Sequence, residues 1–122
     1  MILYCCSDLI FATKIRSTGE ALGVPTQSIP QDTNLAVLKA GQGDGARQDP
    51  DALMVDLELA NGALRLIEQA GNALTNTEVV AFGAHVDKAI LDAAKNHGAD
   101  RVMPRSTFTE QLPALLRKHQ AA

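Results

Sequence analysis

The chain has 122 residues, of which 46% are hydrophobic and 3% aromatic, and its formal net charge is −3. One domain of this size can bury a core built mainly from Leu, Ile, Val and Ala. The negative charge argues against nucleic acid or an anionic membrane as the main partner, since both bind basic surfaces. No apolar run approaches the ~20 residues that span a bilayer. The only cysteines, Cys5 and Cys6, are expected to be free thiols, which predicts a cytoplasmic protein.

Strand and helix signals alternate along the first part of the chain. Residues 2–6 form an apolar run that predicts a strand, and a helix ending at Gly23 is expected after it. Its apolar face carries four residues at helical spacing: Phe11, Ile15, Thr18 and Leu22. Residues 24–29 predict a second strand, whose flanking prolines suit an edge position. A short helix over 35–39 should end at Gly41.

The alternation continues to the end of the chain. Residues 41–51 are rich in glycine and lack apolar periodicity, so they predict a flexible loop. Strands are expected over 52–57, 79–82 and 101–103, and helices from about Asn61, before Gly98 and from about Thr109. The three helices present apolar or partly apolar faces that comprise Leu64, Ile67 and Ala70; Val86, Ile90 and Ala93; and Leu112, Leu115, Leu116 and His119.

Five repetitions of strand and helix predict a parallel sheet with helices on both faces. The predicted fold class is therefore α/β, a three-layer sandwich in one domain that spans residues 1–122. Right-handed connections are expected between the parallel strands.

Asp56 follows a fully apolar run, residues 52–55, and so stands at the carboxyl end of a predicted buried strand. In open α/β sheets, ligands bind in the crevice outside the carboxyl ends of the strands. The ends of two other predicted strands, near Asp8 and Arg105, should meet Asp56 at this edge.

Two stretches carry a resemblance to a known family. Residues 52–62 are similar to the phosphoacceptor strand and following loop of response-regulator receiver domains, and Gly98-Ala99-Asp100 resembles the lead-in to their fifth strand. The resemblance extends over residues 2 to about 119. It implies a flavodoxin-like sheet of order 2-1-3-4-5, signal transduction within a two-component phosphorelay, and a phosphoacceptor position at Asp56.

The metal-binding part of the family pattern is altered in this chain. Receiver domains usually end their first strand with two acidic residues that hold Mg²⁺, whereas Cys6 and Ser7 stand there and Asp8 follows. Asp8 and Asp56 are the remaining candidate metal ligands, but Mg²⁺ prefers oxygen ligands and avoids a soft thiol. We therefore expect no resident cofactor and weak or no phosphorylation of Asp56.

The rest of the expected pocket departs from the pattern as well. Gly83 replaces the hydroxyl residue that follows the fourth strand of receivers, and Arg105 and Ser106 replace a lysine and a proline after the fifth. Gly83 has no side chain with which to bind a phosphoryl group. His85 begins the following helix, where either a pocket residue or an exposed turn histidine is expected.

Cys6 supports an alternative function. A cysteine between a first strand and a helix also occurs in phosphocysteine carriers and in small tyrosine phosphatases, where it would be the nucleophile. Both need a loop whose backbone N–H groups hold phosphate. Residues 7–12 contain no glycine, and the phosphatase arginine is absent because Phe11 and Ala12 stand where it is expected.

The resulting hypothesis is a stand-alone, non-enzymatic receiver-like signalling domain that acts on an unidentified protein partner. A homodimer is also expected, through the surface of the fourth helix, the fifth strand and the fifth helix. Charges of both signs occur there and can pair across a two-fold axis. They are Asp87, Lys88, Asp92, Lys95, Arg101 and Arg117.

Arg105 is expected to bind a carboxylate of the site. An arginine offers a planar fork that suits a carboxylate, and Asp56 and Asp8 are its candidate partners. Such a pair would hold the strand ends in one fixed arrangement in place of a phosphorylation switch. On this hypothesis Arg105→Ala destabilises the protein by roughly 1–3 kcal/mol and Asp56→Asn by less.

Overall fold

The computed structural model describes residues 1–40, 49–83 and 88–119. Five strands form one sheet: β1 (Ile2–Cys5), β2 (Thr26–Ser28), β3 (Ala52–Asp56), β4 (Glu78–Gly83) and β5 (Arg101–Pro104). Five α-helices alternate with them: α1 (Leu9–Leu22), α2 (Leu35–Ala40), α3 (Asn61–Ala73), α4 (Lys88–Asn96) and α5 (Arg105–Arg117). A 3₁₀ turn, η1 (Leu57–Leu59), joins β3 to α3.

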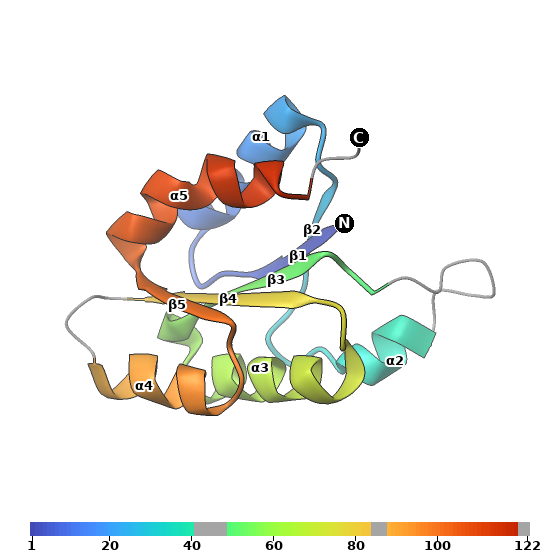
Figure 1. Ribbon diagram of the computed structural model, residues 1–122, viewed down its shortest axis with the longest axis vertical. Coiled ribbons are helices and arrows are strands. Elements are labelled where there is room, and N and C mark those ends of the chain that lie inside the picture. Colours follow the sequence, from blue (N-terminus) through green and yellow to red (C-terminus); the bar gives the residue numbers. More distant parts are fainter. Residues whose placement is uncertain (41–48, 84–87, 120–122) are drawn as a thin grey trace.

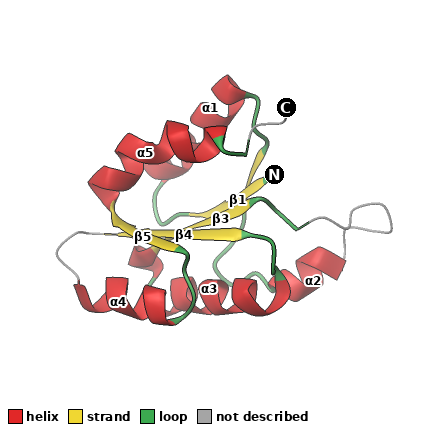
Figure 2. Cartoon of the chain, viewed as in Figure 1, coloured by secondary structure: helices red, strands yellow, loops and turns green. Residues whose placement is uncertain are grey.

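All strand pairs are parallel, and the strands lie in the order β2-β1-β3-β4-β5. Helices α1 and α5 cover one face of the sheet, and α2, α3 and α4 cover the other (Figure 1). The same view coloured by secondary structure separates the two helical layers from the strands between them (Figure 2). The predicted three-layer α/β fold and its strand order are confirmed.

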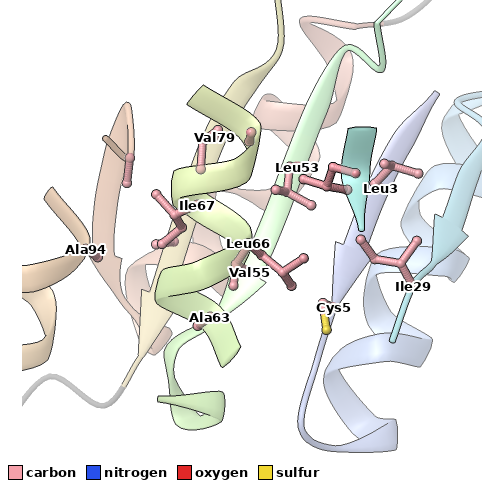
Figure 3. Packing of buried hydrophobic residues seen from close by; sticks show 14 of the residues in the cluster. Leu3, Cys5, Ile29, Leu53, Val55, Ala63, Leu66, Ile67, Val79 and Ala94 are labelled. Atoms are coloured by element: carbon pink, nitrogen blue, oxygen red, sulfur yellow. The ribbon is translucent and has the colours of Figure 1, made fainter. Parts of the chain in front are cut away.

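Alternate residues of the central strands enter two separate cores. Leu3 and Leu53 point toward α3, in a cluster with Leu66 and Ile67 (Figure 3). Their neighbours Ile2 and Met54 join the other cluster, beneath α1 and α5. Successive side chains of a strand point to opposite faces, so a strand covered on both sides is apolar throughout. This explains why residues 52–55 read as a continuous apolar run.

Helix α1 ends at Gly23, as the sequence predicts, and it begins after a cap at Asp8. The Asp8 carboxylate accepts a hydrogen bond from the backbone N–H of Phe11, which is an N-cap. Gly23 ends the helix in the left-handed conformation, with φ of 71°, where a glycine has no Cβ to strain. The strand end at Cys5 and the cap at Asp8 fix the short segment that carries Ser7.

The predicted start of the last helix, near Thr109, is wrong. Helix α5 begins at Arg105, because Pro104 takes extended backbone angles and stands at the N-cap position. Thr109 does not cap a helix; its hydroxyl donates to the carbonyl of Arg105, one turn earlier. The correction matters for the site, since it places Arg105 on the first turn of a helix rather than in a loop.

Smaller differences concern helix faces and regions outside the described residues. In α4 the fully buried residue is Ala94, whereas Ile90 and Ala93 are half-buried. Val86 and most of the expected 41–51 loop lie outside the described residues. Among the helices of the described part of the chain, none has both the length and the hydropathy needed to cross a membrane.

Candidate functional site

Asp56 is the centre of the site at the carboxyl edge of the sheet. It ends β3, and β1 is hydrogen-bonded beside β3, so the segment after β1 lies next to it. The Asp56 side chain is completely buried. A fully buried carboxylate needs hydrogen-bond donors from the protein itself, since few water molecules can reach it.

Neutral donors satisfy both oxygens of Asp56. Ser7 donates twice to Oδ2, through its backbone N–H at 2.9 Å and its hydroxyl at 2.6 Å. The backbone N–H of Glu58 donates to Oδ1 at 3.0 Å, so Asp56 also caps η1. The carboxylate therefore fastens the end of β1 to the turn after β3.

Arg105 forms the predicted ion pair, with Asp8. Its Nη2 lies 2.6 Å from Asp8 Oδ2 and 4.0 Å from Asp56 Oδ2. The Phe11 backbone N–H and the Arg105 guanidinium together hold the pKa of Asp8 below its usual range, against the opposing effect of desolvation. Because Asp8 caps α1 and Arg105 begins α5, the pair joins the N-terminal ends of these two helices beside Asp56.

An aromatic stack supports Arg105 and was not predicted. The guanidinium carbon lies 4.3 Å from the centre of the Phe11 ring, a cation–π distance. Phe11 stacks on Phe82 at 5.7 Å, and Phe82 stacks on Phe108 at 4.0 Å. These are all three phenylalanines of the chain. Two features of the sequence could have indicated this stack: the chain has few aromatic residues, and Phe82 stands at the end of a strand beside Gly83.

The comparisons with known proteins give a fold and no closer relative. No model of a protein family matches the chain, and no curated protein does. Among solved structures, the receiver domain of NtrX from Brucella abortus has a TM-score of 0.74 at 16% identity, covering 97% of this chain and 96% of that one. A response regulator from Thermotoga maritima has a TM-score of 0.67 at 17% identity, with 99% and 97% covered.

A third similar structure is a response regulator protein from Burkholderia pseudomallei with a phosphorylated aspartic acid, a calcium ion and citrate. Its TM-score is 0.71 at 21% identity, covering 94% of this chain and 65% of that one. This chain has the receiver fold. Asp56 stands at the carboxyl end of β3, the central strand of that fold.

The receiver fold implies a magnesium site, and the residues present do not fit one. Both oxygens of Asp56 accept protein hydrogen bonds, and Asp8 is bound to Arg105 and to the end of α1. Cys6 contributes a thiol, which is a poor ligand for Mg²⁺. Within the described residues, no group of three His, Cys, Asp or Glu side chains could hold a metal ion.

Cys6 lies beside this site as a neutral thiol. Burial and the charge of Asp56 raise its pKa to about 12, and burial likewise raises the pKa of the buried Cys5 to about 11. Arg105 acts in the opposite direction on Cys6 but does not offset these effects. A nucleophilic cysteine needs a lowered pKa, since the thiolate is the reactive form.

The remaining predicted pocket residues are Gly83, Ser106 and His85. Gly83 faces Leu57, because a Cβ on Gly83 would come within 3.0 Å of the Leu57 Cβ. It therefore allows η1 to approach the end of β4. Ser106 is exposed on the first turn of α5, and His85 lies outside the described residues.

Proposed function

We propose that the protein is a receiver-fold signalling domain that acts through protein contacts, with Asp56 held in one arrangement and not phosphorylated. It works without a resident metal and without catalysis of its own. The observation that carries this proposal is the complete burial of Asp56, with Ser7 and Glu58 donating to both of its oxygens.

The chemistry of phosphoryl transfer supports the proposal. A carboxylate that attacks phosphorus needs an accessible oxygen, in line with the leaving group, and cations that neutralise the transferred charge. Asp56 has no exposed surface, and the nearby guanidinium of Arg105 is bound more closely to Asp8. Phosphorylation would require the Ser7 hydrogen bonds to break before any compensating contact formed.

The alternative, a phosphocysteine carrier or thiol-dependent phosphatase that uses Cys6, is weaker. At neutral pH a thiol with a pKa of about 12 is almost entirely protonated. The neighbouring charges of Asp56 and Asp8 would also repel an anionic substrate. We keep Cys6 as a second acceptor to be examined in the same experiment.

The signalling partner is proposed to be another protein, met in the cytoplasm, where free thiols such as Cys5 and Cys6 persist. The surface of α4, β5 and α5 remains our proposed contact for that partner protein. Lys88, Asp92 and Lys95 are exposed on it. Arg101 is also exposed there, although it is already paired with Glu78.

Incubation with a small acyl phosphate and Mg²⁺, followed by intact mass spectrometry, tests the proposal. We expect no added phosphate. A hydroxylamine-labile adduct that disappears in Asp56→Asn would contradict it, and an adduct lost only in Cys6→Ser would establish the alternative. The Burkholderia pseudomallei response regulator, solved with a phosphorylated aspartic acid, is the positive control.

A further inference from the structure

Helix α1 exposes apolar side chains at its first turn. Leu9 is 82% exposed and Ile10 76% exposed, the highest values among the large hydrophobic residues that the structure describes. A single exposed leucine is ordinary on a protein surface, but an adjacent pair at one end of a helix is an apolar knob.

The other end of the same helix is hollowed. A pocket of about 360 Å³ lies between α1 and β2 and is lined by Gly19, Gly23 and residues 24–26, together with Arg16 and Glu20. Gly19 allows the close approach of the two elements, since a Cβ there would come within 2.8 Å of the Val24 carbonyl oxygen. Gly23 leaves open space, with no atom within 4 Å of its would-be Cβ.

Leu9 and the pocket lie on one stripe of the helix. Leu9, Thr13, Arg16 and Glu20 follow each other at intervals of four, three and four residues, which places them along one face. All four are exposed. The stripe runs into the pocket because Arg16 and Glu20 also line it. From Leu9 to Gly23 the helix rises by about 21 Å.

The charges on this stripe complement a second copy in antiparallel orientation. Among the described residues, neither Arg16 nor Glu20 forms an ion pair. Side chains of a helix lean toward its N-terminus. When two α1 helices cross near Arg16, each Arg16 leans toward Glu20 of the second copy, and each Leu9 lies over the second copy's pocket.

We propose that the protein self-associates through α1, as a two-fold antiparallel helix pair in which each Leu9 enters the other copy's pocket. The interface is isologous, since the same stripe serves both copies. This inference does not rest on the proposed function, and it places self-association on α1 rather than on the surface of α4, β5 and α5.

The dimer is expected to be weak. One helix per copy buries less than the roughly 1,200–2,000 Å² of a stable interface. The two ion pairs would be exposed and would add little, so most of the affinity comes from the buried leucines. We expect dissociation in the micromolar to millimolar range.

Sedimentation velocity of the whole protein over a range of concentrations, compared with a matched pair of variants, tests this proposal. Leu9→Asp should raise the dissociation constant at least about tenfold. Val37→Asp is the control, because Val37 is 66% exposed on α2 and lies outside the stripe. A wild-type protein that stays monomeric throughout, or a Leu9→Asp variant that dimerises as wild type does, overturns the proposal.

Charge exchange separates this geometry from other interfaces. Arg16→Glu and Glu20→Arg should each weaken the dimer, since each brings like charges together, and the double variant should restore it. Lys88→Glu with Lys95→Glu, on α4, should leave it unchanged. If the α4 variant abolishes association, or the double exchange fails to restore it, the antiparallel α1 pair is wrong.

Discussion

Two acidic residues on neighbouring strands are stabilised in opposite ways. Asp56, at the carboxyl end of β3, is completely buried and accepts only neutral donors. Glu78, at the amino end of β4, is 18% exposed and faces Lys118, Arg101 and His119 at 2.9, 3.0 and 3.3 Å. Burial acts to raise the pKa of Glu78, but the hydrogen bonds from Lys118, Arg101 and His119 together outweigh it and lower the pKa.

The comparison shows two ways in which this fold stabilises a carboxylate with the protein's own groups. At Asp56 the donors belong to Ser7 and Glu58, whose backbone positions are fixed by β1 and η1, so the hydrogen bonds need no charged partner. At Glu78 long flexible side chains supply charge, which salt and pH can weaken. Removing the contacts of Asp56 should therefore cost much stability at any salt concentration. Removing the contacts of Glu78 should cost less, and the cost should fall as salt is added.

The largest expected effect follows removal of Asp56. Asp56→Ala leaves the N–H and O–H groups of Ser7 and the N–H of Glu58 without their acceptor, and we expect a loss of about 3 kcal/mol. Glu78→Ala, in a more exposed site, should cost only about 1 kcal/mol. Urea denaturation of both variants measures the difference. Equal losses of stability would mean that the contacts of Asp56 contribute no more to the fold than those of Glu78.

Ser7 should come next. Ser7→Ala removes one hydrogen bond to a charged acceptor but keeps the backbone donor, so a loss of about 1.5 kcal/mol is expected. Ser106→Ala is the control, because Ser106 is exposed and should change stability by less than about 0.5 kcal/mol. The same urea midpoints serve here, and similar values for both serines would argue against the Ser7 bond.

Arg105 should have a smaller effect than its place in the site suggests. It is 35% exposed, so Arg105→Ala should cost about 1 kcal/mol through lost packing on Phe11 and the lost ion pair. Asp56→Asn turns one oxygen into a donor facing other donors and should cost more, which reverses the order expected from sequence. Denaturation of the two variants side by side decides the order.

The smallest effect concerns pH at Glu78. Because its folded pKa lies below the ordinary glutamate value of 4.5, the group stabilises the protein above that pH and loses this contribution as pH falls through the folded pKa. Glu78→Gln should therefore flatten the decline of stability below pH 4.5, and high salt should reduce the difference between variant and wild type. If the variant and the wild type show the same pH profile, Glu78 does not contribute to the pH dependence of stability.

The fold could be predicted because its signals are local. The central strands β1, β3 and β4 are apolar runs, and the helices have an apolar face or a stop such as Gly23, so the alternation indicates a parallel sheet. The pairing of Arg105 with Asp8 was predictable for a related reason. The carboxyl ends of parallel strands meet at one edge of the sheet. With one arginine and two acidic residues expected at that edge, an ion pair between them could be predicted.

The contacts of Asp56 were not predictable from sequence. In the sequence, Ser7 was interpreted only as the residue that occupies a usual metal-ligand position. Residue types alone do not show that its hydroxyl and its N–H both donate to one oxygen of Asp56. The Phe11–Phe82–Phe108 stack joins three elements far apart in the chain. The start of α5 was missed because Pro104, the last residue of β5, also stands at the N-cap position of the helix.

Thermal denaturation with and without Mg²⁺ tests the central claim, that protein donors replace the metal around Asp56. The wild-type midpoint should stay within about 1 °C at millimolar Mg²⁺, since only a ligand of the folded state raises it. The Cys6→Asp, Ser7→Asp double variant, which restores the acidic pair, should be less stable without metal and should gain several degrees, roughly 3–6 °C, with it. A wild-type midpoint that rises with Mg²⁺ and falls again with a chelator would contradict the account.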